Sequence, residues 1–346
     1  MRLHYSLRLL WVLAGFLVFV LALEATRAGA SDAATLIDRL HVSGFGNSLG
    51  LGWLFAYVVL SGSPVAAVAV SLFAEGTLTQ QETFAMVAGS RLGASFIALA
   101  VGAIYFFVGR RSPDGLGIGV VAMMTTFVTQ IPALALGSVI LREGWLDGVQ
   151  VSTPTALLDA MDAVYGPVVD LLDAVLPDIG LFGAGVALIL GSFWLFDRAL
   201  PSLEGEAESI RRLLRVMNRR PLMFMTGFLV TLTTLSVSIS VTVLVPLALK
   251  GYLRREHVIP YILGANIATF VDTLGASFLV GGDGAVVVVL TQVVSLAVVS
   301  VVMLTVAYRP ATAAVLAVSG WATVSPRRLG MFMFIIVAAP AVLLVR

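Results

Sequence analysis

Two stretches of this chain, GWLFAYVVLSGS (52–63) and GFLVTLTTLSVS (227–238), carry glycine, leucine and serine at matching positions. The match aligns residues 52–89 with residues 227–264 without a gap, and eleven of the thirty-eight paired positions are identical. Self-similarity at a fixed offset indicates two copies of one structural unit. The sequence therefore predicts an internal repeat, with one copy in each half of the chain.

Composition places both copies in a membrane. Of the 346 residues, 59% are hydrophobic and 12% are charged, and the mean hydropathy is +1.01. Only helices and closed barrels satisfy their backbone in lipid, and no apolar stretch shows the alternation of a barrel strand. We therefore predict an all-α polytopic protein of the cytoplasmic (inner) membrane. Its apolar stretches lie at 9–23, 93–108, 116–141, 181–196, 258–280, 285–307 and 329–345.

Several functional classes are excluded or disfavoured by residue content. The chain has no cysteine, so it has no disulfide or thiolate metal site. Its three histidines, His4, His41 and His257, lack the paired spacing of a zinc site. The arginines lie in short loops and form no basic face for nucleic acid. No GxSxG motif or pair of catalytic aspartates is present, so we expect neither an enzyme nor an organic cofactor.

Loop charge predicts how the two copies are oriented, because lysine and arginine are retained on the cytoplasmic side. Residues 74–82 carry two acids and no base, whereas the equivalent residues 249–257 carry three bases and one acid among their charged side chains. Equivalent loops should thus face opposite sides, which gives inverted-topology repeats. Each copy should begin with a re-entrant helical hairpin, at 44–74 and at 221–249. Gly62 and Pro64 would break the first hairpin at its tip, and the hydroxyl-rich 235–238 would break the second.

The remaining segments are assigned by hydropathy and charge. Residues 154–178 should form an amphipathic external helix, because apolar residues recur at helical spacing among aspartates. Residues 1–30 read equally well as a signal anchor or as a signal peptide. The predicted organisation is a first helix at 1–30, a first half at 44–141 (hairpin 44–74, helices 80–108 and 116–141), an external acidic loop at 142–180, a membrane helix at 181–200, a basic cytoplasmic linker at 201–220, a second half at 221–308 and C-terminal membrane helices at 309–346.

The second repeat resembles the type II sodium/phosphate cotransporter family. That family carries, in each of two inverted repeats, a Gln-Ser-Ser-Ser stretch followed by a Gly-Ala-Asn-Ile-Gly-Thr stretch. Here LSVS (235–238) is followed by GANIAT (264–269) in the same order. The resemblance implies a sodium-dependent symporter of phosphate or a similar small anion. The residues that it places in contact with phosphate or Na⁺ are Ser236, Ser238, Asn266 and Thr269, with Ser61 and Ser63 from the first copy.

Within that set, Ser236, Asn266 and Thr269 are the candidates for holding Na⁺. Thr234 is a further candidate for ion coupling, with helix packing as the other interpretation. Hydroxyls and freed backbone N–H groups suit an oxyanion, and freed carbonyls suit a hard cation. The chain departs from the family at both glutamines, which are Leu60 and Leu235 here.

Arg91 stands where the family has the asparagine of the first copy. An arginine inside an apolar span is costly and usually marks a pathway or an ion pair. Three interpretations stay open: Arg91 binds the anionic substrate, pairs with Asp272, or extends toward the external face. Asp272 is itself a candidate for carrying a coupling proton. The expected partners are a small inorganic anion, Na⁺ and the lipid bilayer, and a homo-oligomer stays open.

Three functional hypotheses follow from the sequence. The first is the sodium-coupled symporter of phosphate or a similar oxyanion. The second is a transporter of the same architecture with a changed ligand or with proton coupling through Asp272. The third is a membrane assembly protein that transports nothing, whose two hairpin tips would meet through apolar contacts without a polar cavity.

Overall fold

The computed structural model describes residues 2–30, 43–105, 113–149, 153–199, 219–242, 244, 255–280 and 283–345. Within these ranges the fold is all-α and has no strand. Seven helical segments of the described chain are long and apolar enough to cross a bilayer. The predicted helical class is thus confirmed, and the seven long apolar helices agree with a multi-pass membrane protein. The segments are Arg8–Ala28, Gln80–Ala103, Gly115–Arg142, Ile179–Phe196, Arg255–Val280, Gly284–Thr305 and Pro326–Val345.

The first half of the fold is built on a broken hairpin. Helices α3 (Phe45–Val59) and α4 (Ser63–Ala74) form the hairpin, and α5 (Gln80–Ala94), α6 (Phe96–Tyr105) and α7 (Pro113–Arg142) follow it. Thr79 and Glu82 form a capping box that fixes the start of α5. Helix α3 packs along α5, so the first helix of the hairpin contacts the helix that follows the hairpin.

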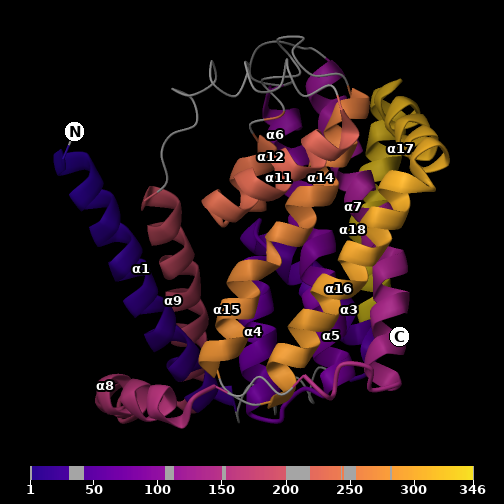
Figure 1. Ribbon diagram of the computed structural model, residues 1–346. Coiled ribbons are helices and arrows are strands. Elements are labelled where there is room, and N and C mark those ends of the chain that lie inside the picture. Colours follow the sequence, from indigo (N-terminus) through magenta and orange to yellow (C-terminus); the bar gives the residue numbers. More distant parts are fainter. Residues whose placement is uncertain are drawn as a thin grey trace.

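The second half repeats this order. Helices α11 (Arg220–Thr234) and α12 (Val237–Thr242) are followed by α14 (Arg255–Ala268), α15 (Phe270–Val280) and α16 (Asp283–Thr305), and α11 packs along α14. In Figure 1, α5 lies in the lower part of the molecule with α6 above it, whereas α14 lies in the upper part with α15 below it. The matching helix pairs therefore run in opposite directions.

Helices outside the two halves cover their flanks. Helix α1 (Arg2–Ala28) packs along α9 (Asp178–Ala199) through Phe19 and Phe193, whose ring centroids lie 5.6 Å apart. Helix α8 (Thr155–Asp173) lies across the lower end in Figure 1. Helices α17 (Tyr308–Thr323) and α18 (Pro326–Val345) complete the chain, and α18 packs on α3.

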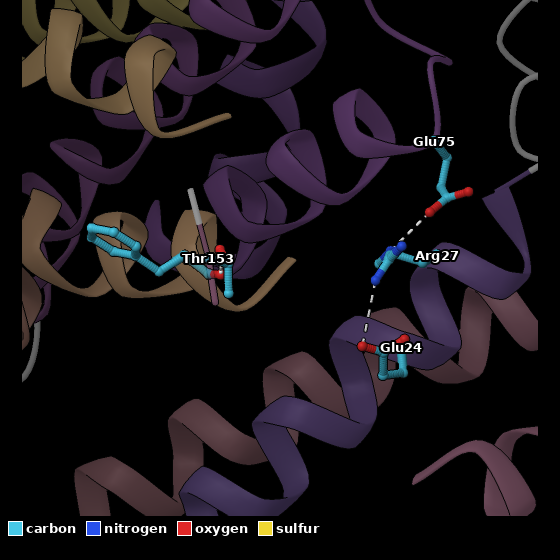
Figure 2. Close-up of polar contacts among 5 residues, drawn as sticks. Glu24, Arg27, Glu75 and Thr153 are labelled. Carbon is cyan, nitrogen blue, oxygen red and sulfur yellow. Dashed lines mark hydrogen bonds and ion pairs between the residues drawn. The ribbon is translucent and has the colours of Figure 1, made fainter. Parts of the chain in front are cut away.

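Polar contacts join α1 and the segment before α8 to neighbouring helices. Arg27 at the end of α1 pairs with Glu75 just beyond α4 at 2.8 Å, and with Glu24 in its own helix at 3.5 Å (Figure 2). Thr153 donates a 2.6 Å hydrogen bond to the carbonyl oxygen of Phe278 in α15. The Arg27–Glu75 pair thus joins the first helix to the first half of the fold, and the Thr153 bond joins the segment before α8 to the second half.

Glycines make the same close contact in both halves. A Cβ added to Gly52 would collide with the carbonyl oxygen of Met86, and one added to Gly227 would collide with that of Tyr261. Gly89 and Gly264 lie equally close to the carbonyl oxygens of Leu49 and Phe224, respectively. Each contact in the first half thus has its aligned counterpart in the second. The shared glycines therefore allow each hairpin helix to approach the next helix closely.

The hairpin breaks are also alike. Helix α3 ends at Leu60, with φ 55°, and α11 ends at Leu235, with φ 50°. These two leucines are the non-glycine residues with positive φ in the described chain. Because a side chain other than glycine costs about 1–2 kcal/mol in the left-handed region, the same strained turn in both halves indicates a common structural demand.

Two further interruptions were not predicted. The sequence indicated continuous helices over 80–108 and 258–280, but the first is interrupted at Ser95 and the second at Thr269. Neither position carries proline or glycine, so local sequence gave no signal for a break. Several predicted features lie outside the described residues. They are positions 201–218 of the basic linker, positions 249–254 of the loop 249–257 whose charge was compared with that of 74–82, and the side chain of Ser238.

Replacing Gly227 by alanine should lower the free energy of unfolding by about 1–3 kcal/mol, because the new methyl group meets the carbonyl of Tyr261. Gly183→Ala is the matched control, since its Cβ would meet no atom within 4 Å. Thermal unfolding of both variants in nanodiscs measures the difference. Equal midpoints for the two variants would contradict the close approach of α11 and α14.

Candidate functional site

A cavity of about 360 Å³ lies between the two broken hairpins. Both tips line it, together with the interruption at Thr269 and parts of α1 and α9. The structure thus gathers most of the predicted site residues in one place. The predicted residues among its lining are Ser61, Ser63, Arg91, Thr234, Ser236, Thr269 and Asp272.

Arg91 is the cationic centre of this cavity. Its side chain comes from α5 and is 6% exposed. Nη1 donates to the Thr269 hydroxyl at 2.6 Å and Nη2 donates to the Thr273 hydroxyl at 3.2 Å. The guanidinium also lies over the ring of Phe270, with 4.7 Å from Cζ to the ring centroid. Its Nε has no hydrogen-bond partner among the described residues.

Gly62 at the first hairpin tip lies directly against this guanidinium. A Cβ at Gly62 would be 3.3 Å from Cζ of Arg91 and closer still to the carbonyl oxygen of Ser90. Helix α4 then begins at Ser63 with no side-chain cap on its first N–H groups. The uncapped start of a helix and a buried guanidinium therefore meet at one wall of the cavity, and both favour negative charge.

Asp272 lies on the same wall and is linked to Arg91 through Thr273. The Thr273 hydroxyl accepts from Arg91 and donates to Oδ1 of Asp272 at 2.9 Å. No ion pair within 4.0 Å joins Arg91 to Asp272 in the described part of the chain. Ser63 lies close to the carboxylate of Asp272. The buried Oδ2 of Asp272 nevertheless has no hydrogen bond of normal geometry to any described residue.

The two hairpin tips contribute hydroxyl groups to the cavity. Ser63 is 7% exposed, and Ser61 and Ser236 are half-buried. Thr234 lines the cavity, but its hydroxyl donates to the carbonyl oxygens of Val230 at 2.8 Å and of Ser236 at 3.2 Å. Thr234 therefore satisfies backbone carbonyls at the break, which is the packing role that was its other interpretation.

Asn266 does not reach this cavity. Its Nδ2 donates to the Thr126 hydroxyl of α7 at 3.1 Å, and it lines a neighbouring crevice of about 10 Å³. The hydroxyl of Thr269 accepts from a guanidinium, which repels a second cation at that oxygen. Of the predicted Na⁺ ligands, Ser236 and Thr269 therefore line this cavity, whereas Asn266 does not.

Some residues of the site were not identified from the sequence. Thr273 follows Thr269 by one helical turn, a spacing that could have placed both hydroxyls on one helix face. The four phenylalanines of α1 and α9 that line the cavity gave no local signal. They are Phe16, Phe19, Phe193 and Phe196.

The second half also contains a buried hydroxyl cluster that the first half lacks. Thr231 donates to the Ser240 hydroxyl at 2.7 Å, and Ser240 lies 2.8 Å from the Tyr261 hydroxyl. The aligned residues of the first half are Ala56, Val65 and Met86, which are all apolar. The two halves share a backbone plan but differ in polarity.

Comparison with known proteins gives no match to this chain among protein-family models, curated proteins or solved structures.

Replacing Thr273 by valine should lower the free energy of unfolding by about 1–3 kcal/mol, because Arg91 and Asp272 both lose their shared hydroxyl. Thr273→Ser retains the hydroxyl and should stay near wild type. Thr233→Val is the control, since the exposed Thr233 hydroxyl bonds only to carbonyls of its own helix in the described structure. Equal unfolding temperatures for Thr273→Val and Thr233→Val would show that the Thr273 hydroxyl between Arg91 and Asp272 contributes nothing to stability.

Proposed function

We propose that this protein is an ion-coupled secondary transporter that carries a small anion, with inorganic phosphate as the first candidate, across the cytoplasmic membrane. One observation carries the proposal: a buried guanidinium lines a cavity between two hairpin tips that break in the same way. An arginine at the centre of an apolar span costs about 3 kcal/mol or more unless it is compensated. An anion in the cavity would provide that compensation.

The architecture that we propose is a pair of inverted repeats, each with a re-entrant hairpin. It is supported by the glycine contacts that recur at aligned positions of the two halves. It is also supported by the opposite vertical order of α5–α6 and α14–α15 in Figure 1. The opposite charge of the equivalent loops 74–82 and 249–257 agrees with it. Transporters with inverted repeats bind substrate near mid-membrane, where broken helices meet.

Arg91 is well placed to recognise an oxyanion. Its planar guanidinium is held by Thr269 and Thr273, which fix its orientation before a ligand arrives. Its Nε remains without a partner in the described structure. Hydroxyls of Ser61, Ser63 and Ser236 lie on the facing tips and can donate to further oxygens of the same anion.

Asp272 supplies a candidate for coupling. Asp272 lines the cavity, and its Oδ2 is buried and lacks a partner among the described residues. A proton or a Na⁺ ion can occupy such a carboxylate oxygen, and either would add positive charge beside Arg91. Binding of the cation and of the anion would then favour each other, which is the requirement for symport.

A membrane assembly protein without transport is the less favoured alternative. That hypothesis expects the two tips to meet through apolar contacts, whereas a cavity of about 360 Å³ with seven predicted polar residues lies between them. A buried cation facing open volume has no evident purpose in a packed scaffold.

Uptake of labelled phosphate into proteoliposomes tests the proposal. Arg91→Gln should reduce uptake at least about tenfold, because charge-assisted hydrogen bonds contribute roughly 1.5–3 kcal/mol each, and Arg91→Lys should retain part of the activity. Arg142→Gln is the matched control, since Arg142 is exposed at the end of α7. Uptake that is insensitive to Arg91→Gln would contradict the proposed anion site.

The coupling ion is identified in the same vesicles by imposing a Na⁺ gradient or a pH gradient separately. We expect one of the two gradients to drive accumulation in wild type, and Asp272→Asn to remove that dependence while leaving downhill exchange measurable. Accumulation by Asp272→Asn equal to that of wild type would exclude Asp272 as the coupling group.

A further inference from the structure

We infer that the anion that fits this cavity best carries an apolar group, so that an amphipathic organic monoanion replaces inorganic phosphate as the first candidate substrate. The inference rests on the proposed transport function and specifies its substrate. It places the anionic head at Arg91 and the apolar part against the phenylalanines of α1 and α9.

The size of the cavity exceeds the need of an inorganic ion. At roughly 30 Å³ per water molecule, the volume of about 360 Å³ corresponds to about a dozen waters. A tetrahedral oxyanion has the size of only a few waters. The remaining volume falls in the range of pockets that hold organic ligands of moderate size, about 300–1,000 Å³.

The walls of the cavity are divided by polarity. The charged and hydroxyl side chains come from the hairpin tips, α5 and the α14–α15 interruption. A further part of the lining comes from α1 and α9 and is aromatic. Phe19, Phe193 and Phe196 pack edge to face with centroids 5.6–6.4 Å apart, so this wall is well packed. A ligand that is polar at one end and apolar at the other matches both walls.

The tips themselves add apolar surface. Leu60 and Leu235 both line the cavity and are 40% and 41% exposed. Phe16 on α1 also lines it and is 47% exposed, within a segment long and apolar enough to cross the bilayer. The cavity is therefore lined in part by exposed apolar side chains, against which an alkyl or aryl group can pack away from water.

The charges of the cavity favour a single negative charge on the ligand. Its lining contains one guanidinium and one carboxylate. A monoanion at Arg91, with a proton or Na⁺ at Asp272, leaves the filled cavity neutral. A dianion would leave one uncompensated charge in a medium of low dielectric constant, which is costly.

Binding of methane-, butane-, hexane- and octanesulfonate to the full-length protein in zwitterionic nanodiscs tests the inference. These probes carry one fixed negative charge at every chain length. Affinity should rise by up to about fourfold per methylene until the aromatic wall is covered, and each alkanesulfonate from butane upward should bind more tightly than phosphate. Hexylammonium, which carries the opposite charge, controls for partition of the alkyl chain into the lipid. Oleate, a monoanion that partitions into the bilayer, tests whether a ligand reaches the cavity from the bilayer or from water.

Two variants connect the effect to the two walls. Arg91→Gln should abolish binding of every sulfonate. Phe193→Ala should flatten the dependence of affinity on chain length, and Phe334→Ala, at a side chain 74% exposed on α18, is the matched control. Should Phe193→Ala fail to fold, the chain-length series on wild type decides alone.

Phosphate binding at least as tight as that of hexanesulfonate, or affinity that does not rise with chain length, would overturn the amphipathic substrate and leave anion transport standing. An absence of Arg91-dependent binding for phosphate and for every sulfonate would overturn both proposals together.

Discussion

A helix that ends in the middle of an apolar layer leaves backbone N–H and C=O groups where no water can satisfy them. In the architecture that we propose, two helices of this chain end in that way, α3 just before Leu60 and α11 just before Leu235. Both leucines adopt the same left-handed conformation. Much of the rest of the fold serves these two breaks. Thr234 donates to carbonyls around the second break, and serines occupy both tips. Glycines at equivalent positions let each broken hairpin lie against the following helix.

The same constraint explains why a guanidinium can be kept inside the fold. Arg91 is surrounded by groups that the interruptions expose: the Thr269 hydroxyl, the glycine tip at Gly62 and, through Thr273, the carboxylate of Asp272. These contacts satisfy both Nη atoms but leave Nε and one oxygen of Asp272 without partners in the described structure. A site that is almost satisfied without its ligand, and fully satisfied with an anion and a cation, is the physical basis of the proposed coupling.

The sequence predicted features that depend on local pattern. Helical class, the seven apolar spans and the breaks at the two serine-bearing tips follow from composition, length and residue type, and the structure has them. The cavity residues on the tips could also be named, because the alignment of the two copies identified them. What failed depends on contacts between distant elements. The orientation of Asn266 toward Thr126 and the aromatic wall from α1 and α9 are set by packing between helices. The interruption at Ser95 occurs without a glycine or proline at that position, so residue type did not predict it.

The most direct test of the central claim, that the two halves enter the membrane from opposite sides, uses the absence of native cysteine. Gln81 and Glu256 are the second residues of α5 and α14, and these positions are equivalent in the alignment of the two copies. Single cysteines at each position, probed in whole cells with a maleimide that does not cross membranes, report the side directly. We expect Gln81→Cys to react in intact cells and Glu256→Cys to react only after the membrane is opened. Reaction of both cysteines from the same side would contradict inverted repeats and, with them, the site between opposed hairpins.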